Sequence, residues 1–154
     1  MTQVAACGKK NNDESGTASE AAPFPTAATL GEQVVLTAAE YLETEPYASA
    51  NRSKGERQEM LCKACHSLNK GGANMIGPAL YGFIGTNVGT RAGFEYSAVM
   101  RNADFVWTPE ALDAWLAQPG RFLPGNRMTF AGVPDQKDRA DLIAYLIEAT
   151  TSDR

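Results

Sequence analysis

The sequence predicts an all-α domain that follows a flexible N-terminal tether. Residues 8–29 are mainly small and polar, so they bury too little apolar surface to offset the entropy of ordering. Residues 108–118 and 136–150 combine helical apolar spacing with recognisable end signals. Residues 67–96 are rich in glycine and show no strand-like alternation. With 154 residues, the chain is long enough for one domain and not comfortably for two.

Charge and composition exclude several classes of protein. Residues 1–46 carry seven acidic and two basic side chains, a net charge of −5, whereas residues 47–154 sum to +1. No basic face is evident, so nucleic-acid binding is not expected. No run of about 18 apolar residues occurs, so no transmembrane helix is expected. Three cysteines and one histidine are too few for a disulfide-rich scaffold, and a four-ligand zinc site would use nearly all of them.

We assign residues 1–46 as the tether and residues 47–154 as the folded domain. The tether contains a short apolar run from Val34 to Leu36, followed by Tyr41 and Leu42. From the sequence alone, this stretch either packs on the domain or continues the linker.

Cys7 follows Val4, Ala5 and Ala6, a pattern that resembles the lipobox of bacterial lipoproteins. A tether follows the cysteine, as a lipid anchor would require. The alternative is a chance cysteine, because neither a basic segment nor an apolar stretch of about 7–15 residues precedes it. If the lipobox is genuine, we expect the complete gene to encode about 15–25 further apolar and basic residues before Val4.

The first two expected helices have weak signals. Residues 50–64 have a faint apolar stripe, and residues 97–103 have room for a short helix. The third expected helix, 108–118, has Thr108 as an N-cap, Pro109 in its first turn, and a stop at Pro119 and Gly120.

The last helix, 136–150, has the strongest pattern in the chain. Asp135 is a suitable N-cap, and Asp138 follows three residues later. Leu142, Leu146 and neighbouring apolar residues form one stripe, which is typical of a helix packed on a core.

The sequence Cys62-Lys63-Ala64-Cys65-His66 is the c-type haem attachment signature. Two thiols three positions apart on one helical turn reach the two vinyl groups of a haem, and the next histidine then lies beneath the iron. A zinc site is a poor alternative because few other soft ligands exist. A thioredoxin-like pair would need a βαβ unit, and none is evident.

A second axial ligand would have to be a methionine, because no other histidine exists. Met60 and Met75 lie too near His66 in sequence to cross easily to the opposite haem face, whereas Met100 and Met128 are far enough away. We favour Met128, because proline and glycine residues bracket it in a non-helical segment suited to presenting one side chain. The alternative role for each methionine is core packing.

From about residue 50 to residue 151, the chain resembles class I cytochrome c. The resemblance implies a cytochrome c-like fold of three to five helices wrapped around one covalently bound haem c. It rests on these segments in order: CKACH at 62–66, GPALYGFIG at 77–85, GFEYS at 93–97, Trp107, LDAWLAQP at 112–119, PGNRMTFAG at 124–132 and DLIAYL at 141–146.

The resemblance also implies roles for individual residues. The Pro78 carbonyl would accept a hydrogen bond from the His66 ring. Tyr96 and Trp107 match positions that hydrogen-bond one haem propionate, and Asn126 lies where the family often has a threonine near the other. Core packing remains the alternative role for Tyr96 and Trp107.

The chain departs from the family pattern at two places. Thr86 stands near the position of the arginine that often balances a propionate, and Arg91 is a candidate substitute. Trp115 replaces a tyrosine that commonly reaches the methionine sulfur, and an indole N–H donates but does not accept. For Tyr145 we favour a plain core role.

The resemblance implies a monomeric one-electron carrier, not an enzyme, that serves a redox protein such as an oxidase, reductase or dehydrogenase. Four basic residues would lie near the haem edge, where they either steer a partner or form ordinary surface: Lys63, Lys70, Arg121 and Arg127. It also implies the bacterial periplasm, with membrane tethering if Cys7 is lipidated.

Three alternatives remain open from the sequence. The first is a haem enzyme or gas sensor with a displaceable Met128. The second is a thiol–disulfide protein that uses Cys62 and Cys65. The third is a domain that serves only as a fixed subunit of a larger oxidase.

Overall fold

The structure, a computed structural model, describes residues 25–151. No strand occurs in that range, where the one β-type pairing is a single bridge between Asn87 and Val106. The all-α prediction is confirmed. The helical segments in chain order are η1 (Ala27–Thr29), α1 (Ala38–Leu42), α2 (Arg52–Gln58), α3 (Met60–Lys63), α4 (Ala98–Asn102), α5 (Pro109–Ala117), α6 (Pro119–Phe122) and α7 (Gln136–Thr151).

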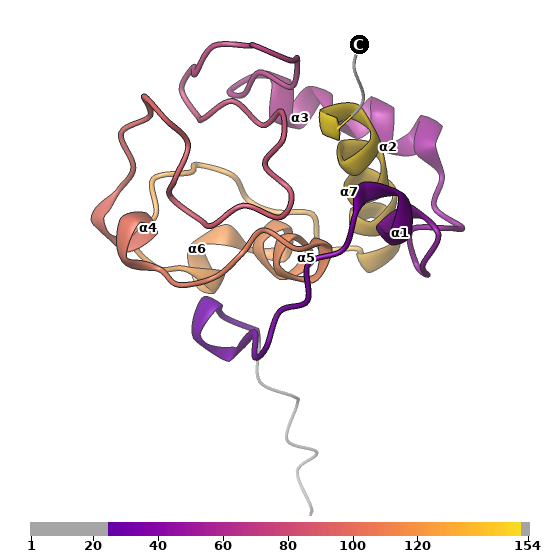
Figure 1. Cartoon of the computed structure of the whole chain (residues 1–154), viewed down its shortest axis with the longest axis horizontal. Helices are drawn as coiled ribbons and strands as arrows, with labels where there is room; N and C mark the ends of the chain where they lie inside the picture. The colour runs from indigo at the N-terminus through magenta and orange to yellow at the C-terminus, as the bar shows by residue number, and fades with distance from the viewer. Residues whose placement is uncertain (1–24, 152–154) are drawn as a thin grey trace, which may run out of the picture.

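Helix α7 is the centre of the packing, and α2, α5 and α1 all lie against it (Figure 1). The predicted cap is confirmed, because the Asp138 N–H donates to Asp135 Oδ1 at 2.9 Å. The buried surface of α7 is wider than the single apolar stripe that the sequence predicted. Ala140, Ala144 and Thr150 are also buried, since neighbours cover the helix on several sides.

Helix α2 crosses α7 at Gly55. A Cβ atom placed on Gly55 would lie 2.2 Å from the Asp141 carbonyl oxygen and 2.7 Å from Tyr145 Cβ. This close backbone approach explains the faint apolar stripe of residues 50–64, because a glycine and not a large side chain makes the contact. Asp141, itself fully buried, accepts a hydrogen bond from the Asn51 N–H at 2.7 Å and so joins the start of α2 to α7.

A buried polar contact lies where α2 gives way to α3. The Tyr145 hydroxyl donates to Glu59 Oε2 at 2.8 Å, and Glu59 is 4% exposed. Lys63 pairs with the other oxygen of that carboxylate at 2.5 Å. Tyr145 therefore lies in the core, and its hydroxyl has a specific partner there.

The assignment of the whole of residues 1–46 as a tether is wrong for the part that the structure describes. Residues 25–46 pack on the domain, and Tyr41 is 2% exposed. Helix α1 begins with a capping box, in which the Glu40 N–H donates to Thr37 Oγ1 and Glu40 accepts from the Thr37 N–H. Residues 1–24, with Cys7, lie outside the described residues. Within residues 25–151, no helix combines the length and apolar character needed to cross a membrane.

The N-cap predicted for α5 is confirmed, because Thr108 Oγ1 accepts from the Ala111 N–H at 3.3 Å. The predicted stop at Pro119 and Gly120 is only partly correct. Helix α5 ends there, but Pro119 opens a further helical turn, α6, since proline suits a first helical position. This turn buries Phe122, which is 1% exposed.

The α2–α7 crossing generates a stability prediction. We expect Gly55→Ala to lower the free energy of unfolding of the haem-loaded protein by at least about 2 kcal/mol, because the new methyl group meets backbone that cannot move aside. Chemical denaturation followed by circular dichroism measures the change. The matched control is Gly120→Ala, where no atom lies within 4 Å of the added Cβ. Equal stability of the two variants would contradict the close crossing.

Candidate haem site

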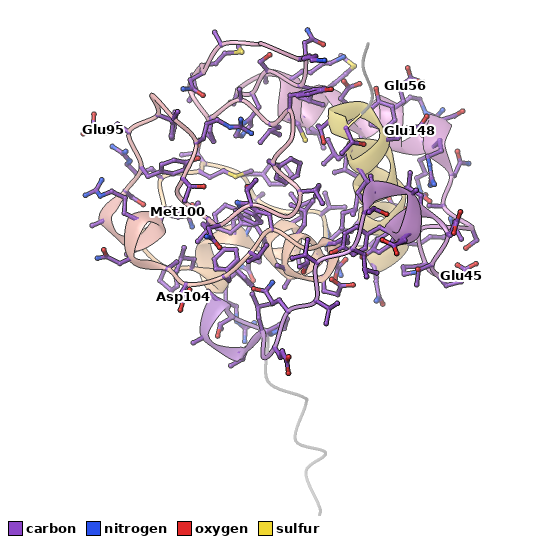
Figure 2. The ribbon with its side chains drawn as sticks, in the orientation of Figure 1. Glu45, Glu56, Glu95, Met100, Asp104 and Glu148 are labelled. Atoms are coloured by element: carbon purple, nitrogen blue, oxygen red, sulfur yellow. The ribbon has the colours of Figure 1, made fainter. Side chains whose placement is uncertain are left out.

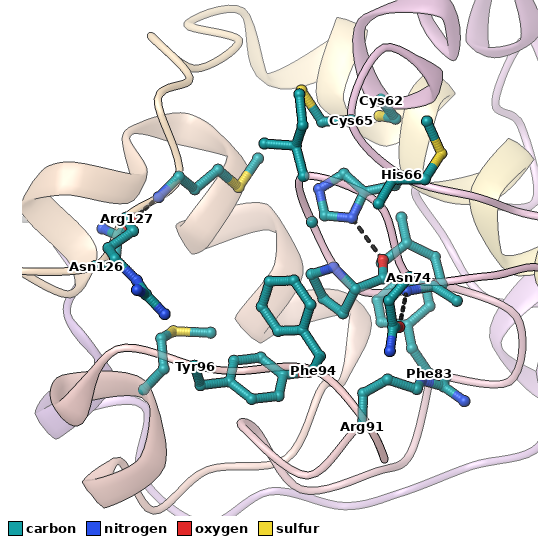
Figure 3. A pocket seen from close by; sticks show the side chains of 18 of the residues that line it. Cys62, Cys65, His66, Asn74, Phe83, Arg91, Phe94, Tyr96, Asn126 and Arg127 are labelled. Atoms are coloured by element: carbon teal, nitrogen blue, oxygen red, sulfur yellow. Dashed lines mark hydrogen bonds between the residues drawn. The ribbon is translucent and has the colours of Figure 1, made fainter.

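A cavity of about 1000 Å³ lies between α3, the 74–97 loop, α5 and the chain around Met128. Its volume is at the upper end of the range for ligand pockets, so its shape suits one large ligand. Figure 3 shows Cys62, Cys65 and His66 on one side of the cavity, and Asn126 and Arg127 on the other. All eight residues singled out for cofactor binding line it: Cys62, Cys65, His66, Pro78, Tyr96, Trp107, Asn126 and Met128.

The two cysteines lie on one helical turn that runs past the end of α3. The Cys65 and His66 N–H groups both donate to the Cys62 carbonyl, at 3.0 and 2.9 Å. Burial, and then the nearby Glu59 carboxylate, raise the pKa of the Cys62 thiol to about 11. Among residues 25–151, no three His, Cys, Asp or Glu side chains are grouped so that they could hold a metal ion.

The His66 ring is oriented by the Pro78 carbonyl, which lies 2.7 Å from Nδ1. A carbonyl oxygen only accepts, so Nδ1 carries the hydrogen and Nε2 presents its lone pair. Burial lowers the pKa of His66, and the bond to Pro78 opposes that shift in part. The lowered pKa favours the neutral form that ligates metals, and a ring oriented through its second nitrogen is typical of metal-bound histidine.

Gly77 allows the backbone to lie against the face of the His66 ring. A Cβ atom on Gly77 would lie 2.2 Å from His66 Cε1, so no other residue fits without displacing the ring. The Gly77 N–H donates to the Cys65 carbonyl at 2.8 Å, which joins this loop to the cysteine turn. From the sequence, Gly77 was recognisable only as the first residue of the segment 77–85, because its contact with the His66 ring depends on tertiary packing.

Asn126 braces the loop that presents Met128. Its side-chain amide donates to the Pro119 and Leu123 carbonyls at 2.9 and 2.8 Å, and its Oδ1 accepts from the Met128 N–H at 2.9 Å. Both amide hydrogens are thus used within the protein. This pattern differs from the propionate contact that the resemblance implies, although Asn126 does line the cavity.

The other methionines of the described chain differ in whether they line the cavity. Met60 is 75% exposed and does not line the cavity, whereas Met75 and Met100 do. Met100 lies on the inner side of α4 (Figure 2). Facing the same space, the Trp115 ring is 5% exposed and lies edge-on to Trp107, with centroids 5.5 Å apart.

Polar side chains interrupt the apolar lining of the cavity. The Ser97 hydroxyl is buried without a hydrogen bond, and the Trp107 indole lines the same cavity. Tyr96 is another lining residue, and burial raises the pKa of its phenol. Arg91 also lines the cavity and donates to the Tyr81 carbonyl at 2.7 Å. A largely apolar cavity that contains such donors fits a haem, whose propionates require hydrogen-bond partners.

Sequence reasoning missed Ser97, because a serine before a short helix is ordinarily an N-cap. In the structure its side chain makes no cap bond to α4.

All four basic residues expected near the haem edge interact with other groups of the chain. Lys63 is paired with Glu59, and Arg127 donates to the Glu95 carbonyl. Arg127 lines the cavity, whereas Lys63 lies beside it on α3.

Comparison with known proteins supports this interpretation of the cavity. The chain is 43% identical over 108 residues to "Cytochrome c-type cyt cy" of Rhodobacter capsulatus, a match that covers 69% of this chain and 53% of that protein. It is 48% identical over 77 residues to cytochrome c of Trypanosoma brucei brucei, which covers 50% of this chain and 83% of that protein. No protein-family model matches the chain.

A solved structure agrees. Cytochrome cH from Methylobacterium extorquens superposes with a TM-score of 0.58 at 36% identity, over 63% of this chain and 97% of that one. The match spans only about half of two curated relatives, 53% of the Rhodobacter protein and 54% of a cytochrome c homolog of Bradyrhizobium diazoefficiens. The match to most of the Trypanosoma protein and the shared fold establish that the chain belongs to the cytochrome c family, whose members carry one covalently bound haem c.

Proposed function

We propose that the protein is a one-electron carrier, in which Cys62 and Cys65 hold the haem covalently and His66 and Met128 are its axial ligands. The observation that carries the proposal is the His66 ring, which is held by Pro78 and Gly77 with Nε2 free, in a cavity that Met128 also lines. The haem supplies a reversible one-electron couple, and a thioether opposite an imidazole raises its potential.

The chain's own residues would hold both axial ligands in place. Pro78 and Gly77 hold the imidazole, and Asn126 holds the backbone of Met128. With both positions occupied, no coordination site remains for a substrate, so the arrangement supports a carrier and not an enzyme.

The partners and the location are part of the proposal. A redox protein such as an oxidase, reductase or dehydrogenase would dock near the cysteine side of the cavity, with the cytochrome as a monomer. We place the protein in the bacterial periplasm, where haem attachment to such a motif occurs. Lipidation of Cys7 would confine it near the membrane and raise its effective concentration there.

The visible spectrum of the protein, expressed with haem-maturation machinery, tests the proposal. Sharp reduced α and β bands together with the weak far-red band of Met-ligated Fe(III) are expected. Carbon monoxide binding by the reduced wild-type protein would instead support an enzyme or sensor with a displaceable Met128. Absence of haem and two titratable thiols would support a thiol–disulfide protein.

Replacing Met128 should remove the second axial ligand. In Met128→Ala we expect the far-red band to disappear, the potential to fall and carbon monoxide to bind the reduced form. Absorbance spectroscopy and redox titration measure these changes. Met100→Leu is the matched control, because it removes another thioether that lines the same cavity, and it should keep the band. The reverse result would make Met100 the ligand.

Replacing Asn126 should loosen Met128 without removing it. Asn126→Ala deletes three hydrogen bonds to backbone, so we expect exogenous imidazole to displace Met128 with about tenfold higher apparent affinity. Titration of the oxidised protein, followed at the far-red band, measures this. Asn102→Ala, at an exposed asparagine, should behave as wild type. Unchanged imidazole affinity in Asn126→Ala would contradict the bracing role.

A further inference from the structure

The strap, defined here as residues 25–46, contributes one side chain to the edge of the haem domain. Gln33 Nε2 donates to the Val106 carbonyl at 2.7 Å, and Gln33 Oε1 accepts from the Val106 N–H at the same distance. Nε2 also lies 3.3 Å from Thr108 Oγ1, the N-cap of α5. A side-chain amide thus pairs with both backbone groups of one residue, as a neighbouring strand would.

The opposite edge of the same segment is bound to the loop that follows Phe83. The Val88 N–H donates to the Phe105 carbonyl at 3.0 Å, and the Trp107 N–H donates to the Thr86 carbonyl at 2.9 Å. Backbone groups of successive residues in an extended segment point to alternate sides. Residues 105 and 107 therefore pair with the loop, and Val106 pairs with Gln33. The Trp107 backbone is held between these two sets of hydrogen bonds.

The Trp107 indole lines the cavity and lies edge-on to Phe83, Phe105 and Trp115, with ring centroids 6.4, 4.9 and 5.5 Å apart. These contacts favour one tilt of the ring. The backbone that carries the ring is held at Val106 by Gln33, so a change at Gln33 would shift the indole N–H.

We propose that Gln33 is a positioning residue for Trp107, so that the strap is part of the haem site and not only a connection to it. The inference rests on the proposed function, because the ligand of the Trp107 N–H is taken to be a haem propionate. The negative charge of a propionate favours Fe(III) over Fe(II) and so lowers the reduction potential. A well-placed hydrogen-bond donor offsets part of that charge and raises the potential.

The strap has a separate attachment, which makes Gln33 testable alone. The Tyr41 hydroxyl donates to the Val34 carbonyl at 3.1 Å and accepts from the Leu36 N–H at 3.0 Å, and Tyr41 is buried. Helix α1 also packs on α7. A substitution at Gln33 therefore leaves the strap in place.

The experiment uses the full-length haem-loaded protein with Gln33→Leu, which keeps the bulk and removes the hydrogen bonds. NMR hydrogen exchange of the Trp107 indole N–H and the reduction potential are the readouts. We expect exchange about fivefold faster, as for a lost hydrogen bond, and a lower potential. Val34→Ala, an exposed strap residue at 67% exposure, should change neither.

A double-mutant cycle separates positioning from a general loss of stability. In a Trp107→Phe background, Gln33→Leu should cause no further change of potential, because its effect passes through the indole. An equal shift in both backgrounds, or no shift in Gln33→Leu alone, would overturn the proposal. Gln33→Glu retains the acceptor for the Val106 N–H, so its exchange rate should lie between those of the wild-type protein and Gln33→Leu. This variant replaces Gln33→Leu in the experiment if the leucine variant does not fold. A wild-type protein without the expected haem spectrum would refute the proposed function itself.

Discussion

The polypeptide has to close around a cavity of about 1000 Å³, and the arrangement of the domain follows from this requirement. When the cavity is empty, the side chains that line it lack packing partners, which lowers stability. The helices are short and the loops long, and a haem would complete the core in place of a second layer of side chains. Binding and folding would therefore be coupled, and two thioethers would make the coupling permanent.

Helix α7 connects the two walls of the cavity. On one side it meets α2 at Gly55, and α2 leads through α3 to the cysteines. On the other side Arg139, which is 8% exposed, donates to Asp113 of α5 at 2.7 and 3.2 Å and to the Val133 and Pro134 carbonyls at 2.9 Å. This arginine joins α5 to the chain that follows Met128. One helix thus sets the separation between the histidine wall and the methionine wall.

Features that depend on near neighbours could be predicted from the sequence. The caps at Thr108 and Asp135 and the attachment motif each involve residues within a few positions of one another. The strap could have been recognised in part, since the Thr37–Glu40 capping box is present in the sequence. Gln33 could not, because its partner Val106 is 73 residues away and no local pattern encodes that pairing.

Other parts of the site depend on packing that composition does not reveal. The local sequence around Gly55 does not show that this residue is the point of contact, which depends on the position of α7. The local sequence around Ser97 likewise does not show that its hydroxyl is buried without a hydrogen bond. The polar lining of the haem site was therefore only partly predicted, whereas the residues proposed to bind iron were predicted from the motif and from the scarcity of alternatives.

The course of the strap also determines how the domain would hang from an attachment at its N-terminal side. Turn η1, at the start of the described chain, lies at the opposite end of the molecule from α3 and its cysteine (Figure 1). Because Tyr41 and Gln33 hold the strap along the domain, tension applied before residue 25 would be borne far from the cysteine wall. A domain held in this way would be free to reorient about its N-terminal attachment. An attachment on the N-terminal side of η1 would therefore lie away from the cysteine wall, where we propose that electrons are exchanged, and would leave that wall open to a partner.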